Sequence, residues 1–401
     1  MTEETIVAER PVESGGLNGQ AAPVSAATTD GPSAGGLQLD SVVKRYGATT
    51  VLHGLDLEVR AGEFMTILGP SGSGKTTLLR LIGGFVSLSS GKILLAGRDV
   101  SRMTPAERGI GMVFQNYALF PHLTARQNVE YGLKMRRWPR RDRRQRAEEM
   151  LDMVGLGDKS DRLPRQLSGG QQQRVAVARA LAFDPSLLLM DEPLGALDRE
   201  LRMRMAGELR RLHRELGTTV VYVTHDREEA LTLSDRIAVL RDGRLDSLDT
   251  PEALFAAPRS SFAASFFGGH NLLPGRVVDV GSESDTATVE CFDTVVEVRS
   301  GGGLAPGDSA AVVVPMLCCV LDGGVDGLAD GGPCVSLTID DVLYMGEFTQ
   351  VRGVITEGGP AGEALVIQLA GHHVNDIVPG TVRRFSIDPA RCSAVRWSDD
   401  S

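Results

Sequence analysis

The spacing of apolar residues changes twice along the chain and divides it into three parts. Residues 1–36 are rich in Gly, Ala, Ser, Thr and Pro and hold almost no large apolar residue after Val12, which is typical of a disordered tail. From Leu37 to about Gly243, short apolar runs alternate with segments whose apolar residues recur at helical spacing. After about Phe262, short β-branched runs are broken by glycine.

The middle part predicts an α/β domain over residues 37–261. Strand-like runs lie at 51–59, 64–68, 187–190 and 219–223. They alternate with helical patterns at 75–82, 199–216 and 227–233. Alternation of this kind forms a parallel sheet covered by helices. A mainly helical insertion is expected at about 116–165.

The last part, residues 262–401, predicts a small all-β domain. Its β-branched runs lie at 275–280, 287–298, 310–314, 335–344, 349–355, 365–369 and 381–387. Short strands at even spacing are typical of small barrels, so a β-barrel is expected here.

A glycine-rich stretch inside the α/β part matches the pattern G-x-x-x-x-G-K-[ST] of a phosphate loop. Glycines let backbone N–H groups turn inward around a phosphate, and the helix expected from about Gly74 adds its dipole. Lys75 would reach the β- and γ-phosphate oxygens, and Thr76 would offer its hydroxyl to Mg²⁺. The residues of this loop are Gly69, Pro70, Ser71, Gly72, Ser73, Gly74, Lys75, Thr76 and Thr77.

Two further stretches follow in a fixed order. A second helix is expected to open at Ser168, Gly169, Gly170 and Gln171, so a second helix N-terminus is available to phosphate. The apolar run 187–190 lies between prolines and predicts a buried parallel strand, which ends in Asp191 and Glu192. Carboxylates at that end of a strand suit Mg²⁺ binding and general-base chemistry.

These motifs, in this order, resemble the nucleotide-binding subunits of ABC transporters, whose signature is LSGGQ. The resemblance implies an α/β P-loop NTPase core that binds ATP and Mg²⁺ between two head-to-tail copies. Ser168 of one copy would then contact the γ-phosphate held by Lys75 of the other. It also implies that Asp191 holds Mg²⁺ and that Glu192 polarises the attacking water.

Four more positions match the family's motifs. Gln115 corresponds to the Q-loop glutamine, which senses Mg²⁺ and the γ-phosphate, and His225 to the switch histidine, which contacts the γ-phosphate. Asp198 corresponds to the D-loop at the dimer interface, although Gly195 stands where relatives commonly have Ser. Tyr46 corresponds to the aromatic residue that stacks on adenine, and core packing is the alternative reading for its ring.

The resemblance extends to the β-rich part and implies a C-terminal oligomer-binding-like (TOBE) domain. The segments 262–272 and 342–346 resemble that domain in ATPase subunits of the spermidine/putrescine importer group. Where relatives often read Arg-Pro-Glu, this chain has Val314, Pro315 and Met316, so contacts made by those charges are expected to be absent. Polyamine is the expected solute, with ferric iron, phosphonate and sugar as alternatives.

The implied partners are a second copy of the chain, two membrane permease subunits and, indirectly, an extracytoplasmic solute receptor. The net charge of −10 argues against nucleic acid as a partner. The longest apolar run, about 310–321, is interrupted by Pro315 and is shorter than the roughly 20 residues that span a bilayer. Without a secretory signal pattern either, the chain is expected to be peripheral, at the cytoplasmic face of the membrane.

The five cysteines lie in the β-rich part without C-x-x-C spacing, so reduced, mostly buried thiols are expected.

Three alternatives belong to other functional classes. A non-transport ABC ATPase acting on DNA or ribosomes would share the core motifs, but those proteins usually carry a long coiled coil or two ATPase cores. An exporter subunit would fit less well with the β-rich tail and with the missing fused membrane domain. A GTP-binding switch is disfavoured because the Asn-Lys-x-Asp guanine motif does not occur.

Overall fold

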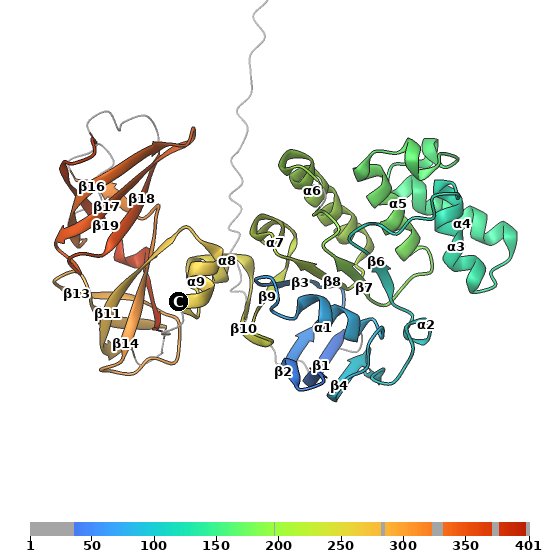
Figure 1. Cartoon of the computed structure of the whole chain (residues 1–401), viewed down its shortest axis with the longest axis horizontal. Coiled ribbons are helices and arrows are strands. Elements are labelled where there is room, and N and C mark those ends of the chain that lie inside the picture. The colour runs from blue at the N-terminus through green and yellow to red at the C-terminus, as the bar shows by residue number, and fades with distance from the viewer. Residues whose placement is uncertain (1–35, 196, 282–284, 323–331, 371–376, 398–401) are drawn as a thin grey trace, which may run out of the picture.

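The computed structural model describes residues 36–195, 197–281, 285–322, 332–370 and 377–397 (Figure 1). The disorder predicted for residues 1–36 therefore concerns a segment that, apart from Gly36, lies outside the described residues. Within the described part, β-rich units lie at one end of the molecule and the helices α3 and α4 at the other, with the large mixed sheet between them (Figure 1).

The central sheet has the strand order β10-β9-β3-β8-β7-β6, in which all strands are parallel except β10. Its strands are β3 (Phe64–Leu68), β6 (Gly111–Val113), β7 (Leu188–Asp191), β8 (Val220–Thr224), β9 (Arg236–Arg241) and β10 (Arg244–Asp249). Leu188 and Met190 face one core, whereas Leu187 and Leu189 face another. Burial on both faces explains why this part of the sequence is apolar without alternation.

A second, antiparallel sheet covers the core on the side of α1 (Lys75–Ile82). Its order is β2-β1-β4-β5, formed by β1 (Leu37–Tyr46), β2 (Thr49–Val59), β4 (Ser90–Leu95) and β5 (Arg98–Asp99). The sequence predicted only the run 51–59 of this sheet, because the other strands are shorter or less regular in their polarity.

Helices pack on the opposite face of the central sheet. The predicted insertion contains α3 (Ala125–Met135), α4 (Arg140–Met153) and the 3-10 turns Gly157–Lys159 and Pro164–Gln166, and it packs on α5 (Gly169–Leu181). The remaining helices are α2 (Pro105–Arg108), α6 (Arg199–Leu216), α7 (Arg227–Leu233), α8 (Pro251–Ala256) and α9 (Ser261–Phe267). No helix in the described part of the chain is long and apolar enough to cross a membrane.

After α9 the described C-terminal part is β-rich, with one 3-10 turn at Pro389–Arg391, and it forms two units where one barrel was expected. A closed barrel has the order β11-β12-β13-β20-β14, and a separate open sheet has the order β15-β19-β16-β17-β18. The barrel strands are β11 (His270–Val280), β12 (Thr286–Glu290), β13 (Val295–Ser300), β14 (Ser309–Pro315) and β20 (Ser393–Arg396). The sheet strands are β15 (Cys319–Leu321), β16 (Cys334–Tyr344), β17 (Phe348–Glu357), β18 (Ala364–Ala370) and β19 (Val382–Ile387).

The predicted single run 287–298 was wrong, because it is divided into β12 and β13. The turn between them places Asp293 at φ 50°, in the left-handed region, and lets the two strands pair antiparallel. Asn271 joins the barrel to the open sheet, since its side chain donates to Val314 O at 3.2 Å and to Val366 O at 2.9 Å and accepts from Val366 N at 2.7 Å.

The cysteines Cys291, Cys318, Cys319, Cys334 and Cys392 are free, as predicted, and all but Cys334 are buried. Burial raises the pKa of the Cys291 thiol to about 12, with a smaller contribution from Asp293. At that pKa the thiol stays protonated at neutral pH and is inert.

Candidate nucleotide site

The candidate site is built on the carboxyl ends of neighbouring parallel strands. The phosphate loop follows β3, the acidic pair ends β7, and His225 follows β8, while Gln115 lies two residues beyond β6. Because these strands are adjacent and parallel, their ends meet at one edge of the sheet. Open α/β sheets place their ligands at this edge.

The phosphate loop folds around the Lys75 ammonium group. Lys75 Nζ donates to Gly69 O and to Pro70 O, each at 2.8 Å, and the residue is largely buried. Burial lowers the pKa of Lys75, and the nearby carboxylates of Glu192 and Asp191 oppose that shift. Among the described residues this buried cation donates hydrogen bonds only to carbonyl oxygens, so a phosphate would be a stronger anionic partner.

The backbone of the loop requires glycine at position 74, directly before Lys75. Gly74 has φ 99°, and a Cβ placed on it would lie 2.8 Å from Leu52 Cδ2 and 3.3 Å from Val51 O. Gly72, with φ 84°, also adopts a conformation that L side chains rarely take. The hydroxyl of Ser73 is buried in this loop and has no hydrogen-bond partner among the described residues. An orphaned donor beside inward-turned backbone is the arrangement that an anion completes.

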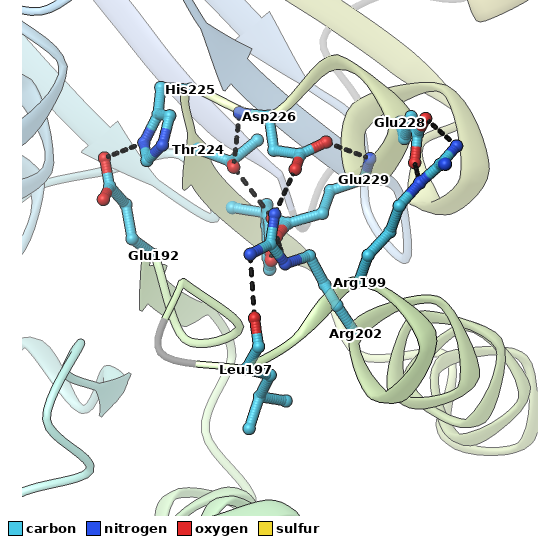
Figure 2. A network of polar contacts seen from close by, with 10 residues as sticks. Glu192, Leu197, Arg199, Arg202, Thr224, His225, Asp226, Glu228 and Glu229 are labelled. Atoms are coloured by element: carbon cyan, nitrogen blue, oxygen red, sulfur yellow. Dashed lines mark hydrogen bonds and ion pairs between the residues drawn. The ribbon is translucent and has the colours of Figure 1, made fainter.

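Three of the predicted catalytic side chains lie together. Glu192 Oε1 is 3.1 Å from His225 Nδ1, and Glu192 Oε2 accepts a hydrogen bond from Gln115 Nε2 at 3.4 Å. Figure 2 shows His225 and Glu192 pointing toward each other. Glu192 itself has φ 43°, an unusual value for a residue other than glycine, and its N–H donates to Val223 O at 2.9 Å. Backbone strain of this kind, which costs about 1–3 kcal/mol, is common at functional sites.

The neighbouring carboxyl groups of Asp191 and Glu192 repel each other. Burial, followed by the charge of Glu192, raises the pKa of Asp191, while Arg80 and Lys75 act in the opposite direction. A divalent cation would relieve this repulsion, and carboxylate, hydroxyl and amide oxygens are the ligand types that Mg²⁺ takes. The half-buried residues Asp191 and Thr76 therefore fit a Mg²⁺ ion, and the exposed Gln115 could add its amide oxygen.

The signature stretch and the phosphate loop of the same chain begin helices on opposite faces of the central sheet, since α5 packs in one apolar core and α1 in the other. Ser168 is exposed at the start of α5, and its N–H donates to Gln171 Oε1 at 3.1 Å in a capping box. A Cβ placed on Gly170 would lie 3.2 Å from Met205 Sδ, so this end of α5 packs on α6. Among the described residues, no hydrogen bond or ion pair joins Ser168, Gly169, Gly170 or Gln171 to the loop.

The two remaining candidate residues have clear local surroundings. Asp198 caps α6, because its Oδ1 accepts a hydrogen bond from Leu201 N at 3.0 Å. Tyr46 is 48% exposed at the end of β1, and Lys44 Nζ lies 4.7 Å from the centre of its ring. Since Leu52, on the paired strand β2, borders Gly74, the β1–β2 hairpin that carries Tyr46 lies next to the phosphate loop.

Sequence reasoning missed a polar network behind His225 (Figure 2). Glu229 is buried on α7 and accepts hydrogen bonds from Tyr222 OH at 2.7 Å and Thr224 Oγ1 at 2.8 Å. Asp226 caps the same helix, and Arg202 reaches it from α6. The spacing of Asp226 and Glu229 matches a helix-start pattern, which could have located the cap but not its partner on α6.

Fold and site together define a P-loop ATPase, and comparisons with known proteins agree. Residues 52–195 match the ABC transporter family. The chain is 49% identical over 286 residues to the spermidine/putrescine import ATP-binding protein PotA of Thermobifida fusca, a match that covers 70% of this chain and 72% of the relative. It is 47% identical over 281 residues to the Fe(3+) ions import ATP-binding protein FbpC 1 of Rhizobium meliloti, covering 70% and 79%.

Among solved structures, cbiO1 of Clostridium perfringens, part of the ABC transporter complex cbiONQ, superposes with a TM-score of 0.51 at 29% identity. That superposition covers 54% of this chain and 89% of cbiO1. The chain belongs to the ABC transporter ATP-binding protein family. It is an ATP-binding ATPase of that class.

The geometry of the loop predicts the effect of a single methyl group. Gly74→Ala should weaken ATP binding at least about 10-fold, because a left-handed backbone costs alanine about 1–2 kcal/mol and its Cβ would press on Leu52. Gly207→Ala is the matched control: Gly207 is exposed within α6, and a Cβ there would meet no atom within 4 Å. The control should bind ATP normally and gain up to about 1 kcal/mol of stability. Equal ATP affinities for both variants, by titration calorimetry, would contradict the loop geometry.

Proposed function

We propose that this chain is the ATP-hydrolysing subunit of an ABC importer for polyamines of the spermidine and putrescine type. The observation that carries the proposal is the convergence of Lys75, Glu192 and His225 at one edge of the parallel sheet. The likeness to an ATP-binding protein named for spermidine/putrescine import supports the choice of solute. A ferric-iron importer is the second candidate, favoured by the likeness to the Fe(3+) import protein. Phosphonate and sugar remain alternatives on resemblance alone.

We further propose that two copies form the complete nucleotide sites, head to tail. The exposed Ser168 and its separation from the phosphate loop support this arrangement, since a residue that contacts the partner's ATP must face outward. Ser168, Gly169, Gly170 and Gln171 would then close on the γ-phosphate, with Asp198 at the interface between the copies. Tyr46 would stack on adenine, and Lys44 would remain near the same ring.

The chemistry follows from the charges at the site. Lys75 and the backbone N–H groups of residues 69–77 would hold the β- and γ-phosphates and stabilise the charge that develops on them. When bound by Asp191, Thr76 and Gln115, Mg²⁺ would supply further positive charge to those phosphate oxygens. Glu192 would orient the attacking water and accept its proton. His225, 3.1 Å from Glu192, would hold the γ-phosphate on the other side.

The work done by this cycle would be transmitted to two membrane permeases at the cytoplasmic face of the membrane. ATP-driven closure of the two copies would move permease segments lodged near Gln115 and the helical insertion, and hydrolysis would release them. A separate extracytoplasmic receptor would select the solute. In domain terms, residues 37–261 would form the ATPase, with the insertion at about 116–165, and residues 262–401 would form the TOBE-like domain.

Lys75→Ala tests the phosphate site. The variant should bind ATP about 100-fold more weakly, because it loses at least one charge-assisted hydrogen bond to phosphate. Its stability should change little, because alanine removes two hydrogen bonds to carbonyl oxygens but also the cost of burying the ammonium group. Fluorescent-nucleotide titration measures the affinity, and normal turnover of ATP by Lys75→Ala would overturn the site.

The solute is tested with the complete transporter. The chain, its permeases and its receptor in liposomes should hydrolyse ATP faster when spermidine or putrescine is present, and should not respond to ferric iron or a disaccharide. Stimulation by ferric iron alone would replace polyamine with the second candidate. Steady hydrolysis that none of these solutes changes would contradict the polyamine assignment and favour another solute or a non-transport ATPase.

A further inference from the structure

A single guanidinium group joins two loops of the candidate site (Figure 2). Arg202 Nη2 donates to Leu197 O at 2.8 Å, and Arg202 Nη1 donates to Asp226 Oδ2 at 2.5 Å. Its Nε lies 3.7 Å from Glu229 Oε1. The Arg202 side chain is 24% exposed and that of Asp226 is 20% exposed, so their contact is partly shielded from water. Charge-assisted contacts of this kind are strong and geometrically specific.

One of the two loops precedes α6 and touches the signature helix. Leu197, whose carbonyl Arg202 holds, is directly followed by the helix cap Asp198. A Cβ placed on Gly169 would lie 3.4 Å from Leu197 Cδ2, so the side chain of Leu197 packs under the start of α5. The hydrogen bond from Arg202 to Leu197 therefore links Arg202 to the face that carries Ser168 and Asp198.

The other loop carries His225. On one side of it, Thr224 Oγ1 accepts a hydrogen bond from Asp226 N at 3.0 Å and donates to Glu229 Oε2. On the other side, Asp226 Oδ1 caps α7 by accepting from Glu229 N at 3.1 Å. His225 is thus fixed between two residues that are themselves tied to Glu229 and Arg202, while its ring projects toward Glu192.

Because Glu229 is buried, its carboxylate depends on the positive charge of Arg202 for compensation. Glu229 is 1% exposed, and burial raises its pKa, while hydrogen bonds from Tyr222 and Thr224 and the charge of Arg202 act in the opposite direction. Removing the cation would leave two carboxyl groups, those of Asp226 and Glu229, next to each other without compensation.

We propose that Arg202 is a positioning residue for ATP hydrolysis. It holds His225 against Glu192 by joining the loop that carries His225 to the loop that follows β7. The inference rests on the proposed function, because it assigns Arg202 a part in that hydrolysis. Arg202 also connects the face with Ser168 and Asp198, which would meet the partner's ATP, to His225, which would act on this chain's own ATP. Closure of the second copy on Asp198 and Ser168 would reach His225 along this path.

A lysine cannot replace this arginine. The guanidinium group presents its donors in a planar fork and reaches a carbonyl and a carboxylate at once, whereas an ammonium group acts as a point charge on a flexible stem. Arg202→Lys therefore keeps the charge beside Glu229 but breaks the link between the two loops. A displacement of about 1 Å in a catalytic group can cost about 100-fold in rate.

The chain provides a matched control three residues earlier. Arg199 also extends from α6 to α7, where it pairs with Glu228 at 2.6 Å. That pair is exposed, with Arg199 at 81%, and among the described residues no hydrogen bond or ion pair joins Arg199 to Leu197, Asp226 or His225. Exposed ion pairs contribute little to stability.

The experiment compares ATP turnover, KM for ATP and melting temperature of the full chain and its variants. Arg202→Lys should lower kcat about 10-fold or more, with KM within about two-fold and a nearly unchanged melting temperature. Asp226→Asn should lower kcat similarly, and the double variant should be no slower than the slower single variant, because both residues serve one link. Arg199→Lys should match the unchanged chain.

Three results would overturn the inference. They are a kcat for Arg202→Lys within two-fold of the unchanged chain, a loss of kcat matched by weaker ATP binding and a lower melting temperature, and an equal loss in Arg199→Lys. A different result would show that the proposed function itself is wrong. The unchanged chain would then hydrolyse no ATP in the same assay, and the inference would fall with it.

Discussion

The candidate site depends on the alignment of the parallel strands β3, β8, β7 and β6 at one edge of the central sheet. Each strand delivers one chemical group to that edge: the loop that holds Lys75, the switch histidine, the acidic pair and Gln115. Because side chains alternate along a strand, a slip of one residue in any pairing would turn that strand's core residues outward and shift the group that follows the strand. The two apolar cores on either face of the sheet fix the register, so the packing of the protein also sets the geometry of its chemistry.

Electrostatics sets the state of this edge. Lys75 is buried, donates hydrogen bonds to two carbonyl oxygens and lies near two carboxyl groups, and burial disfavours the charge on both Lys75 and Asp191. Phosphate and a divalent cation together would satisfy both signs of charge at once. Glu192 and Gly74 both have positive φ at this edge. Such local backbone conformations are tolerated because the surrounding sheet and helices are fully packed.

The parts of the site that sequence reveals are local. The phosphate loop and its helix, the acidic pair after an apolar run, and the helix that starts at Ser168 were each predicted from a few adjacent residues, and these elements lie where they were expected. The network of Arg202, Asp226 and Glu229 could not be predicted, because it joins two helices through side chains more than twenty residues apart along the chain. The two β units of the C-terminal part were missed for a similar reason. Strand spacing indicates β structure, but the pairing of β20 with both β13 and β14, which closes the barrel, is a non-local choice.

We propose that two copies share the nucleotide site, with Lys75 from one and Ser168 from the other. Light scattering of the Glu192→Gln chain with and without ATP tests this most directly, because a chain that binds but does not hydrolyse ATP should accumulate as the closed pair. ATP should double the mass of Glu192→Gln. Adding Ser168→Arg, a change at an exposed position, should leave ATP bound to single chains. A mass that ATP does not change, or a Ser168→Arg variant that pairs as readily, would contradict the shared site.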